Sequence, residues 1–155
     1  LAHTILQAAP RSEVYTFGTR LTRLTRALRR RRREQALAEA SGLVADWDGG
    51  TRIGDALQAF LAVPRFASYV RGAVVVVFSD GLERGDSSAL VQAVARIAAR
   101  AHRIDWLSPL ASDPAFRPET EALRLIAPWL TRLSGGASTA GICRHILSLG
   151  RGQAA

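Results

Sequence analysis

The sequence contains no lysine, no methionine and no asparagine, and it has a single cysteine, Cys143. Without lysine, the chain can neither hold phosphate through a P-loop lysine nor form a Schiff base with a carbonyl substrate. One cysteine cannot form a disulfide within the chain, which is typical of a reducing compartment, so we expect a cytoplasmic protein. No apolar run approaches the roughly 20 residues that a membrane-spanning helix needs.

The charge of the chain is mostly of one sign. All 21 basic residues are arginine, the acidic residues number 13, and the net charge is +8. Five arginines are consecutive: Arg29, Arg30, Arg31, Arg32 and Arg33. Such a cluster creates a field that could attract nucleic acid or an acidic membrane surface. Because the interleaved aromatic residues of single-strand binders are missing, we interpret the run as a solvated face or a partner-docking surface. Nucleic-acid binding stays the alternative.

The chain is long enough for one domain with a sizeable core. Hydrophobic periodicity predicts strands that alternate with helices, which is typical of an α/β fold with a doubly wound, mostly parallel sheet. The expected strands are 13–17, 21–25 (antiparallel to the first), 73–78, 103–107 and 129–133. The expected helices are 33–44, 51–60, 87–101, 119–127 and 139–149. The run 73–78 indicates a strand buried on both faces. Helix 33–44 is expected to turn Leu37, Ala40 and Val44 inward.

Two loops of this fold carry candidate ligands. Asp80 ends the buried strand in VVVVFSDGLERGD, and Thr51 closes the loop WDGGT before a helix. Ligands of open α/β sheets bind at the carboxyl ends of the strands, so these two oxygen-bearing side chains are expected to meet there. Hard cations such as Mg²⁺ prefer oxygen ligands. The residues expected to shape the loops are Gly49, Gly50, Ser79 and Gly81, and Trp47 is expected at the rim of a partner surface.

Each of these residues also has a simpler interpretation. Asp80 with Gly81 is a common turn pair, and Thr51 is a good helix N-cap. Asp55 is expected to pair with Arg52 or with solvent. Asp86 is expected to cap the helix that begins near residue 87, which argues against an adhesive role for the tripeptide Arg-Gly-Asp. Cys143 is expected in the core, and Trp47, Trp106 and Trp129 are expected to be packing residues.

An enzymatic alternative follows from the strand that ends at an acid. Phosphatases of the haloacid dehalogenase type place a nucleophilic aspartate there and a second aspartate two residues later. Here Leu82 takes that second position, and no lysine is present to hold phosphate. The three histidines lack the spacing of a zinc protease site. We therefore expect no catalytic residues.

The ordered set of motifs resembles a known family. GGTRIGDAL followed by a strand ending in SDGLERGD is similar to the von Willebrand factor A domain, and most similar to its CoxE-like branch. EVYTFGTRLTRLTRAL and AHRIDWLSPL resemble the same branch, so the likeness covers nearly the whole chain. The resemblance implies a doubly wound sheet with a metal-ion-dependent adhesion site (MIDAS) at its carboxyl edge. It also implies that Thr51 and Asp80 are ligands of Mg²⁺, or of Mn²⁺ or Ca²⁺, and that a partner's carboxylate completes the coordination.

The family's role implies partners as well. CoxE-like proteins work beside MoxR-type AAA+ ATPases in the maturation of metalloenzymes such as carbon monoxide dehydrogenase. One departure stands out, because the family's Asp-x-Ser-x-Ser loop occurs nowhere in this sequence. LAHTILQAA, at residues 1–9, has helical spacing and no N-cap. We therefore expect a chain that lacks the first central strand and its loop, with an incomplete site that binds Mg²⁺ weakly or not at all.

Overall fold

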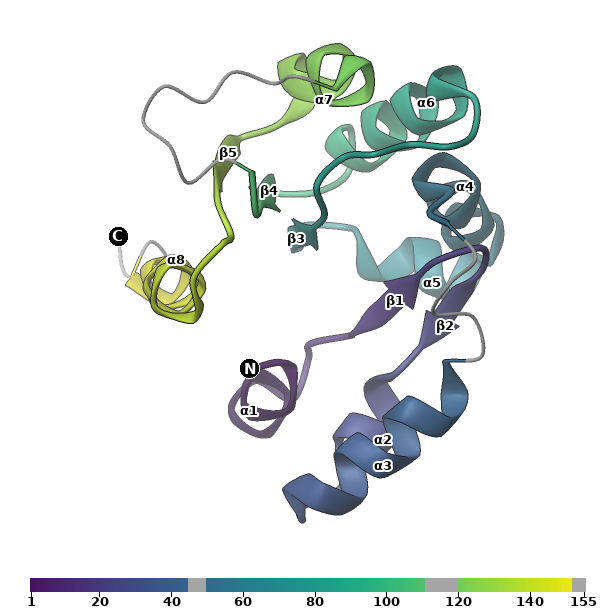
Figure 1. Ribbon diagram of the computed structural model, residues 1–155. Coiled ribbons are helices and arrows are strands. Elements are labelled where there is room, and N and C mark those ends of the chain that lie inside the picture. The colour runs from purple at the N-terminus through teal and green to yellow at the C-terminus, as the bar shows by residue number, and fades with distance from the viewer. Residues whose placement is uncertain (45–49, 111–119, 152–155) are drawn as a thin grey trace.

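A computed structural model describes residues 1–44, 50–110 and 120–151 of the chain (Figure 1). The strands are β1 (Tyr15–Phe17), β2 (Leu21–Arg23), β3 (Val74–Phe78), β4 (Arg103–Ser108) and β5 (Arg132–Gly135). The α-helices are α1 (Ala2–Ala8), α2 (Thr25–Leu28), α3 (Arg33–Leu43), α4 (Ile53–Ala62), α5 (Pro64–Tyr69), α6 (Ser87–Ala98), α7 (Glu121–Ile126) and α8 (Thr139–Arg151). A short 3-10 helix, η1 (Ala127–Trp129), follows α7.

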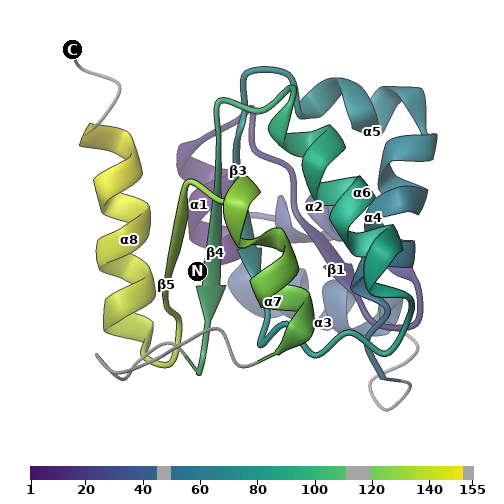
Figure 2. The same cartoon turned by 90° about the horizontal axis from the view of Figure 1, so that it is seen from above.

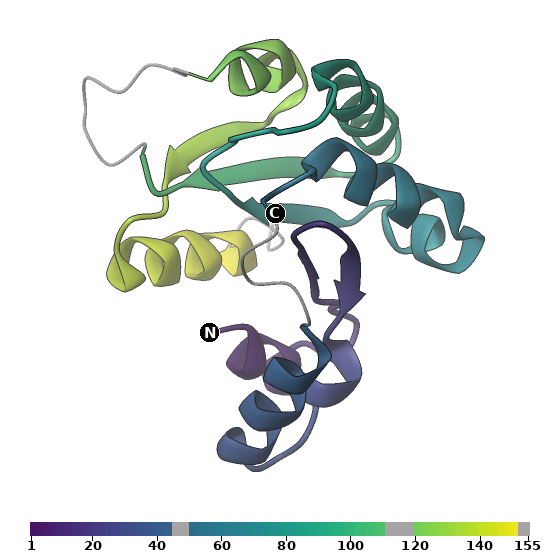
Figure 3. The same ribbon diagram turned by 45° about the vertical axis from the view of Figure 1, so that its right-hand side comes forward.

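The sheet β3-β4-β5 is parallel throughout, with Val76 opposite Asp105 and Trp106 opposite Leu133. Helices α6 and α7 lie on one face and α8 lies on the other (Figures 1 and 3). This arrangement confirms the predicted α/β class, because crossover helices connect parallel strands by covering the faces of their sheet. β1 and β2 form a separate antiparallel hairpin, also as predicted.

The main core lies between the sheet and helices α4, α6 and α7. It is built from apolar residues on the inward faces of these elements, among them Ile53, Leu90, Val94, Trp106 and Leu123. A second, smaller cluster joins α1, α2 and α3 through Leu6, Ala27, Leu28 and Ala40. Seen from above, these three helices lie beneath the sheet (Figure 2). The candidate loop that carries Asp80 begins at the carboxyl end of β3, whereas the loop that carries Thr51 connects α3 to α4.

Several expectations about individual elements were wrong. The strand at 73–78 is not buried on both faces, because Val74, Val75 and Val76 are half-buried and Phe78 is 45% exposed. Leu37 of α3 is 48% exposed, and Ala36 instead takes the inward position beside Ala40.

The last strand and its neighbours also differ from expectation. It covers residues 132–135 rather than 129–133, because Pro128 and Trp129 form η1. Cys143 is half-buried and is not a core residue. Trp129 is 38% exposed. The short helices α2 and α5 were not expected at all. Within the described ranges, no helix combines the length and the apolar character that crossing a membrane requires.

Candidate functional site

Asp80 lies in a tight turn directly after β3. Its Oδ1 accepts the backbone N–H of Leu82 at 3.0 Å, and the Ser79 hydroxyl accepts the N–H of Gly81 at 3.1 Å. Gly81 has φ +77°, and a Cβ there would collide with the side chain of Leu123 on α7. The turn therefore needs glycine for both its backbone conformation and its packing. Asp80 does form a turn, and its half-buried carboxylate keeps a second oxygen for other contacts.

Ser79 connects the same turn to the neighbouring strand. Its N–H donates to the carbonyl of Leu107 at 3.1 Å, and its carbonyl accepts the indole Nε1–H of Trp106 at 2.9 Å. The Trp106 side chain is fully buried, so this bond satisfies an indole N–H that has no access to water. The turn that carries Asp80 is thus fixed to β4 as well as to β3.

Thr51 lies in the loop before α4 and is half-buried. It does not cap the helix, since α4 begins at Ile53 and its N-cap residue, Arg52, makes no side-chain capping bond. The loop that follows β3 contacts this segment directly, because the N–H of Arg84 donates to the carbonyl of Thr51 at 3.0 Å. The N–H of Arg52 donates to the carbonyl of Gly18, in the turn after β1, at 3.1 Å. Three loops therefore meet at one edge.

Glu83, which is not among the predicted site residues, holds the two candidate loops together. One carboxylate oxygen accepts the N–H of Gly54, in the first turn of α4, at 2.7 Å, and the other accepts the N–H of Gly85 at 2.6 Å. A negative charge at a helix N-terminus is favourable, because the free N–H groups there carry partial positive charge. The sequence carried no signal for this role, because Thr51 is a suitable N-cap by residue type and only the structure shows that α4 begins at Ile53.

The remaining predicted site residues are placed as follows. Gly50 has φ +75° and lies against the side chain of Arg84. Gly49 and Trp47 lie outside the described residues, so their predicted roles stay predictions. The bond between Arg52 and Asp55 is present at 3.5 Å, and Asp86 caps α6 by accepting the N–H of Ser88 at 2.8 Å, both as expected. The hydrogen bonds from the Ser88 hydroxyl and backbone lower the pKa of Asp86.

Thr51 and Asp80 suit a hard cation by chemistry, because a hydroxyl and a carboxylate are oxygen donors. They provide few ligands, however. In the described part of the chain, no three His, Cys, Asp or Glu side chains are grouped so that they could hold a metal ion. Of the residues predicted from the sequence, at most two can therefore serve as protein ligands at this edge.

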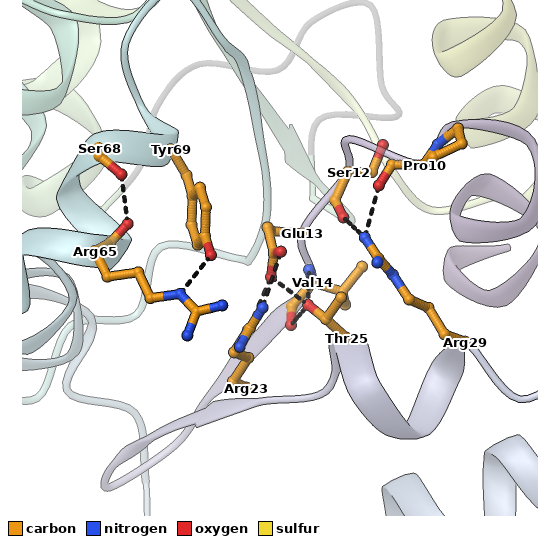
Figure 4. Close-up of polar contacts among 10 residues, drawn as sticks. All are labelled: Pro10, Ser12, Glu13, Val14, Arg23, Thr25, Arg29, Arg65, Ser68 and Tyr69. Carbon is orange, nitrogen blue, oxygen red and sulfur yellow. Dashed lines mark hydrogen bonds and ion pairs between the residues drawn. The ribbon is translucent and has the colours of Figure 1, made fainter.

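The arginine run connects α2 to the first residue of α3. All five arginines are exposed. Arg29 donates to the carbonyls of Pro10 and Ser12 at 2.7 and 3.3 Å (Figure 4), and Arg30 pairs with Glu39 at 2.8 Å. These two side chains thus make contacts within the domain.

A buried carboxylate connects the sheet to α8. Asp105 of β4 is fully buried and accepts hydrogen bonds from Arg103 at 3.0 Å and from the His145 ring at 2.8 Å. His145 belongs to α8, so the pair fastens this helix to the sheet. Nothing in the spacing of the three histidines predicted this contact.

The parallel sheet with helices on both faces and loops gathered at its carboxyl edge defines a Rossmann-like α/β domain. A comparison with protein families matches residues 1–138 to the model "VWA domain containing CoxE-like protein". The chain therefore belongs to the CoxE-like family of VWA domain proteins. Comparisons with curated proteins and with solved structures found no match.

Proposed function

We propose that this chain is a protein-docking module in which Thr51 and Asp80 hold a divalent cation, Mg²⁺ in the first place. One observation supports this most directly: the hydrogen bonds Arg84–Thr51 and Glu83–Gly54 join the two loops that carry these oxygens. Loops that are tied to each other and to the sheet can present two ligands in a fixed relation, which a metal site requires.

The metal would supply charge and direction to the contact with the partner. Mg²⁺ takes six oxygen ligands and readily keeps several waters, so two protein ligands leave positions for water and for a partner's carboxylate. A partner's carboxylate can bind a fixed cation only if it has both the right charge and the right position. The metal contact would therefore contribute to the specificity of binding more than to its affinity. This role requires the chain to break no bond, so we propose that the domain is not an enzyme.

The proposed partner is a MoxR-type AAA+ ATPase, and the proposed process is the maturation of a metalloenzyme such as carbon monoxide dehydrogenase. This part of the proposal comes from membership in the CoxE-like family. The exposed Arg31, Arg32 and Arg33 offer a second, electrostatic contact for an acidic surface on the partner. Contacts of that kind speed association and weaken as salt is added.

The test measures binding of a MoxR-type ATPase to the chain by calorimetry, with Mg²⁺ and with excess EDTA. We expect Thr51→Ala and Asp80→Asn each to weaken Mg²⁺-dependent binding by roughly tenfold, the effect of losing about 1.4 kcal/mol. Asp80→Asn keeps an acceptor for the Leu82 N–H and removes the charge, so it separates ligation from turn formation.

Asp55→Asn is the matched control, because Asp55 is an exposed acid near the same loop that pairs only with Arg52 in the contacts described. It should leave binding unchanged. Equal affinity of wild type and both site variants, or equal affinity with and without EDTA, would overturn the proposal.

A further inference from the structure

The side chain of Arg84 lies between the two candidate loops. Its backbone N–H donates to the carbonyl of Thr51 at 3.0 Å. A Cβ on Gly50, the residue before Thr51, would lie 2.7 Å from the Cδ of Arg84 and 2.8 Å from its Nη1. The side chain therefore folds back from the loop after β3 onto the loop before α4. A guanidinium group is thus placed beside the residue that precedes a proposed metal ligand.

Gly50 leaves the space that Arg84 occupies. Its φ of +75° is a conformation that glycine adopts without strain. Ordinary contacts between carbon atoms are about 3.5–4.0 Å, so a side chain at residue 50 would have to displace the arginine. The position of the guanidinium therefore depends on glycine at residue 50.

Arg84 also points outward from its loop. Leu82 and Arg84 are exposed, whereas Glu83 between them is half-buried. Glu83 uses one carboxylate oxygen for the N–H of Gly54 and the other for the N–H of Gly85. In an extended segment, neighbouring side chains point to opposite sides, which explains this alternation. The inward acid fixes the loop, and the outward arginine faces solvent.

The charge of Arg84 has no acidic partner among the ion pairs of the described residues. The acidic side chains of the neighbouring segments each already have a hydrogen bond or an ion pair: Asp55, Asp80, Glu83 and Asp86. A guanidinium is planar and its N–H donors match the two oxygens of a carboxylate. An exposed guanidinium that is held against Gly50 and lacks an ion pair is therefore suited to an incoming carboxylate.

We propose that Arg84 binds an acidic side chain of the protein partner, next to the carboxylate that completes the metal site. This inference rests on the proposed function, in which the cation held by Thr51 and Asp80 is the first positive centre. The guanidinium is the second, and two neighbouring positive centres select a segment with two negative groups. In an extended segment, side chains two positions apart lie on one side, ~6.6 Å from each other. The partner segment therefore has two acidic residues separated by one other residue.

A nucleic acid fits this edge less well than an acidic protein segment. Binding to a phosphate backbone uses several basic side chains at once. Arg84 instead shares its loop with three acids, Asp80, Glu83 and Asp86, whose negative field opposes a chain of phosphates. A short segment with two carboxylates needs only the two positive centres.

The test measures binding of a MoxR-type ATPase to variants of the chain by calorimetry, in Mg²⁺ at low and at high salt. We expect Arg84→Gln to weaken binding about fivefold at low salt, the effect of one partly exposed charge contact. This difference should shrink as salt is added. Arg84→Lys keeps the charge but loses the planar fork, so its affinity should lie between those of Arg84→Gln and wild type.

Arg71→Gln is the matched control. Arg71 is an exposed arginine that lies before β3, at the amino end of the same strand. Its replacement changes the net charge by the same amount as Arg84→Gln and leaves the carboxyl edge intact. We expect ATPase affinity within twofold of wild type, about the effect of an exposed charge outside the contact.

Gly50→Ala tests the placement of the arginine without changing any charge. The added methyl group should displace the Arg84 side chain, so it should weaken binding about as much as Arg84→Gln, and combining the two should add little. Gly72→Ala is the control, because Gly72 also has positive φ, +68°, and a Cβ there meets nothing within 4 Å. Circular dichroism checks that each variant folds, and Arg84→Gln keeps the test valid if Gly50→Ala does not.

A fluorescein-labelled peptide tests the chemistry of the partner directly. It contains two aspartates separated by one serine, and its anisotropy reports binding in Mg²⁺. We expect replacement of either aspartate by asparagine to weaken binding to the wild type about fivefold. On Arg84→Gln, replacing the aspartate that contacts residue 84 should have no further effect, since the interaction is already lost.

Several results would overturn the proposal. Equal ATPase affinity of Arg84→Gln and Arg71→Gln would do so, as would equal binding of the peptides with two and with one aspartate, or no binding of either. Stronger competition by a single-stranded RNA than by the two-aspartate peptide would assign the arginine to phosphate instead. The failure of the metal site is distinguishable, because it appears as equal affinity with and without EDTA while the effect of Arg84→Gln remains.

Discussion

Replacing Glu83 by alanine removes the side chain that joins the two candidate loops. Its carboxylate accepts the Gly54 N–H at 2.7 Å and the Gly85 N–H at 2.6 Å. The first bond crosses from the loop after β3 to the start of α4, where Arg52 provides no side-chain cap. After the substitution, the first turn of α4 has lost both an acceptor and a favourable negative charge.

The expected cost can be estimated from these contacts. A hydrogen bond to a charged group contributes about 1.5–3 kcal/mol, and the helix dipole adds about 0.3–1 kcal/mol. Because Glu83 is only half-buried and the Gly85 bond spans two residues, water replaces part of what is lost. We expect a decrease of about 2 kcal/mol in the free energy of unfolding. For a domain of this size, that corresponds to a melting temperature lower by about 4–8 °C.

Urea unfolding followed by circular dichroism measures this decrease. Asp55→Ala is the matched control, since it removes an exposed acid in the first turn of the same helix, and an exposed pair contributes about 0–1 kcal/mol. If Glu83→Ala and Asp55→Ala differed by less than about 0.5 kcal/mol, the typical effect of a neutral surface substitution, the linking role of Glu83 would be refuted.

Three further predictions concern other parts of the domain. Gly81→Ala should lower the free energy of unfolding in urea by about 1–3 kcal/mol more than Gly72→Ala does. Both glycines have positive φ, but only a Cβ at residue 81 would overlap a neighbour. Equal decreases would contradict the packing argument. Burial raises the pKa of Glu13, but hydrogen bonds from Arg23 and Thr25 (Figure 4) outweigh it and lower the pKa below 4.5. Glu13 therefore contributes its full stabilisation above the pKa of the unfolded chain, and this contribution is lost as the pH falls through the lower pKa of the folded state. We expect the free energy of unfolding of Glu13→Gln to fall less in acid than that of the wild type. An unchanged pH profile would contradict this prediction. Asp105→Ala should cost about 3–5 kcal/mol and speed amide exchange in α8, since it leaves the buried His145 ring and the Arg103 guanidinium without their acceptor. Unchanged exchange would show that other contacts hold the helix.

Local sequence patterns were enough to predict most of the framework. The β-branched run 73–78 contains β3, and the acid at its end does occupy a loop at the carboxyl edge. Asp86 caps α6 because an aspartate directly before a helix accepts hydrogen bonds from the first N–H groups of that helix, which requires no contact with distant residues. These features depend on residues within a few positions of each other, so the sequence alone contains the necessary information.

Features that depend on distant contacts were not predictable in this way. The start of α4 is displaced from Thr51 to Ile53, and its first turn is satisfied by a side chain 29 positions later. Leu37 was assigned inward from spacing alone, but α3 packs on α1 and α2 through small alanines instead. Periodicity identifies an apolar face only when one face is clearly apolar, and α3 has no such face.

The composition of β3 conflicts with its position in the described sheet. Exposed sheet edges are normally protected by charged residues, proline or bulges. VVVVF, at residues 74–78, contains no charge and no proline, and its composition is typical of a strand with neighbours on both sides. A contact that covers this edge would remove the conflict. Since Asp80 follows β3 after only one residue, such a contact would also restrict the turn that carries the proposed metal ligand.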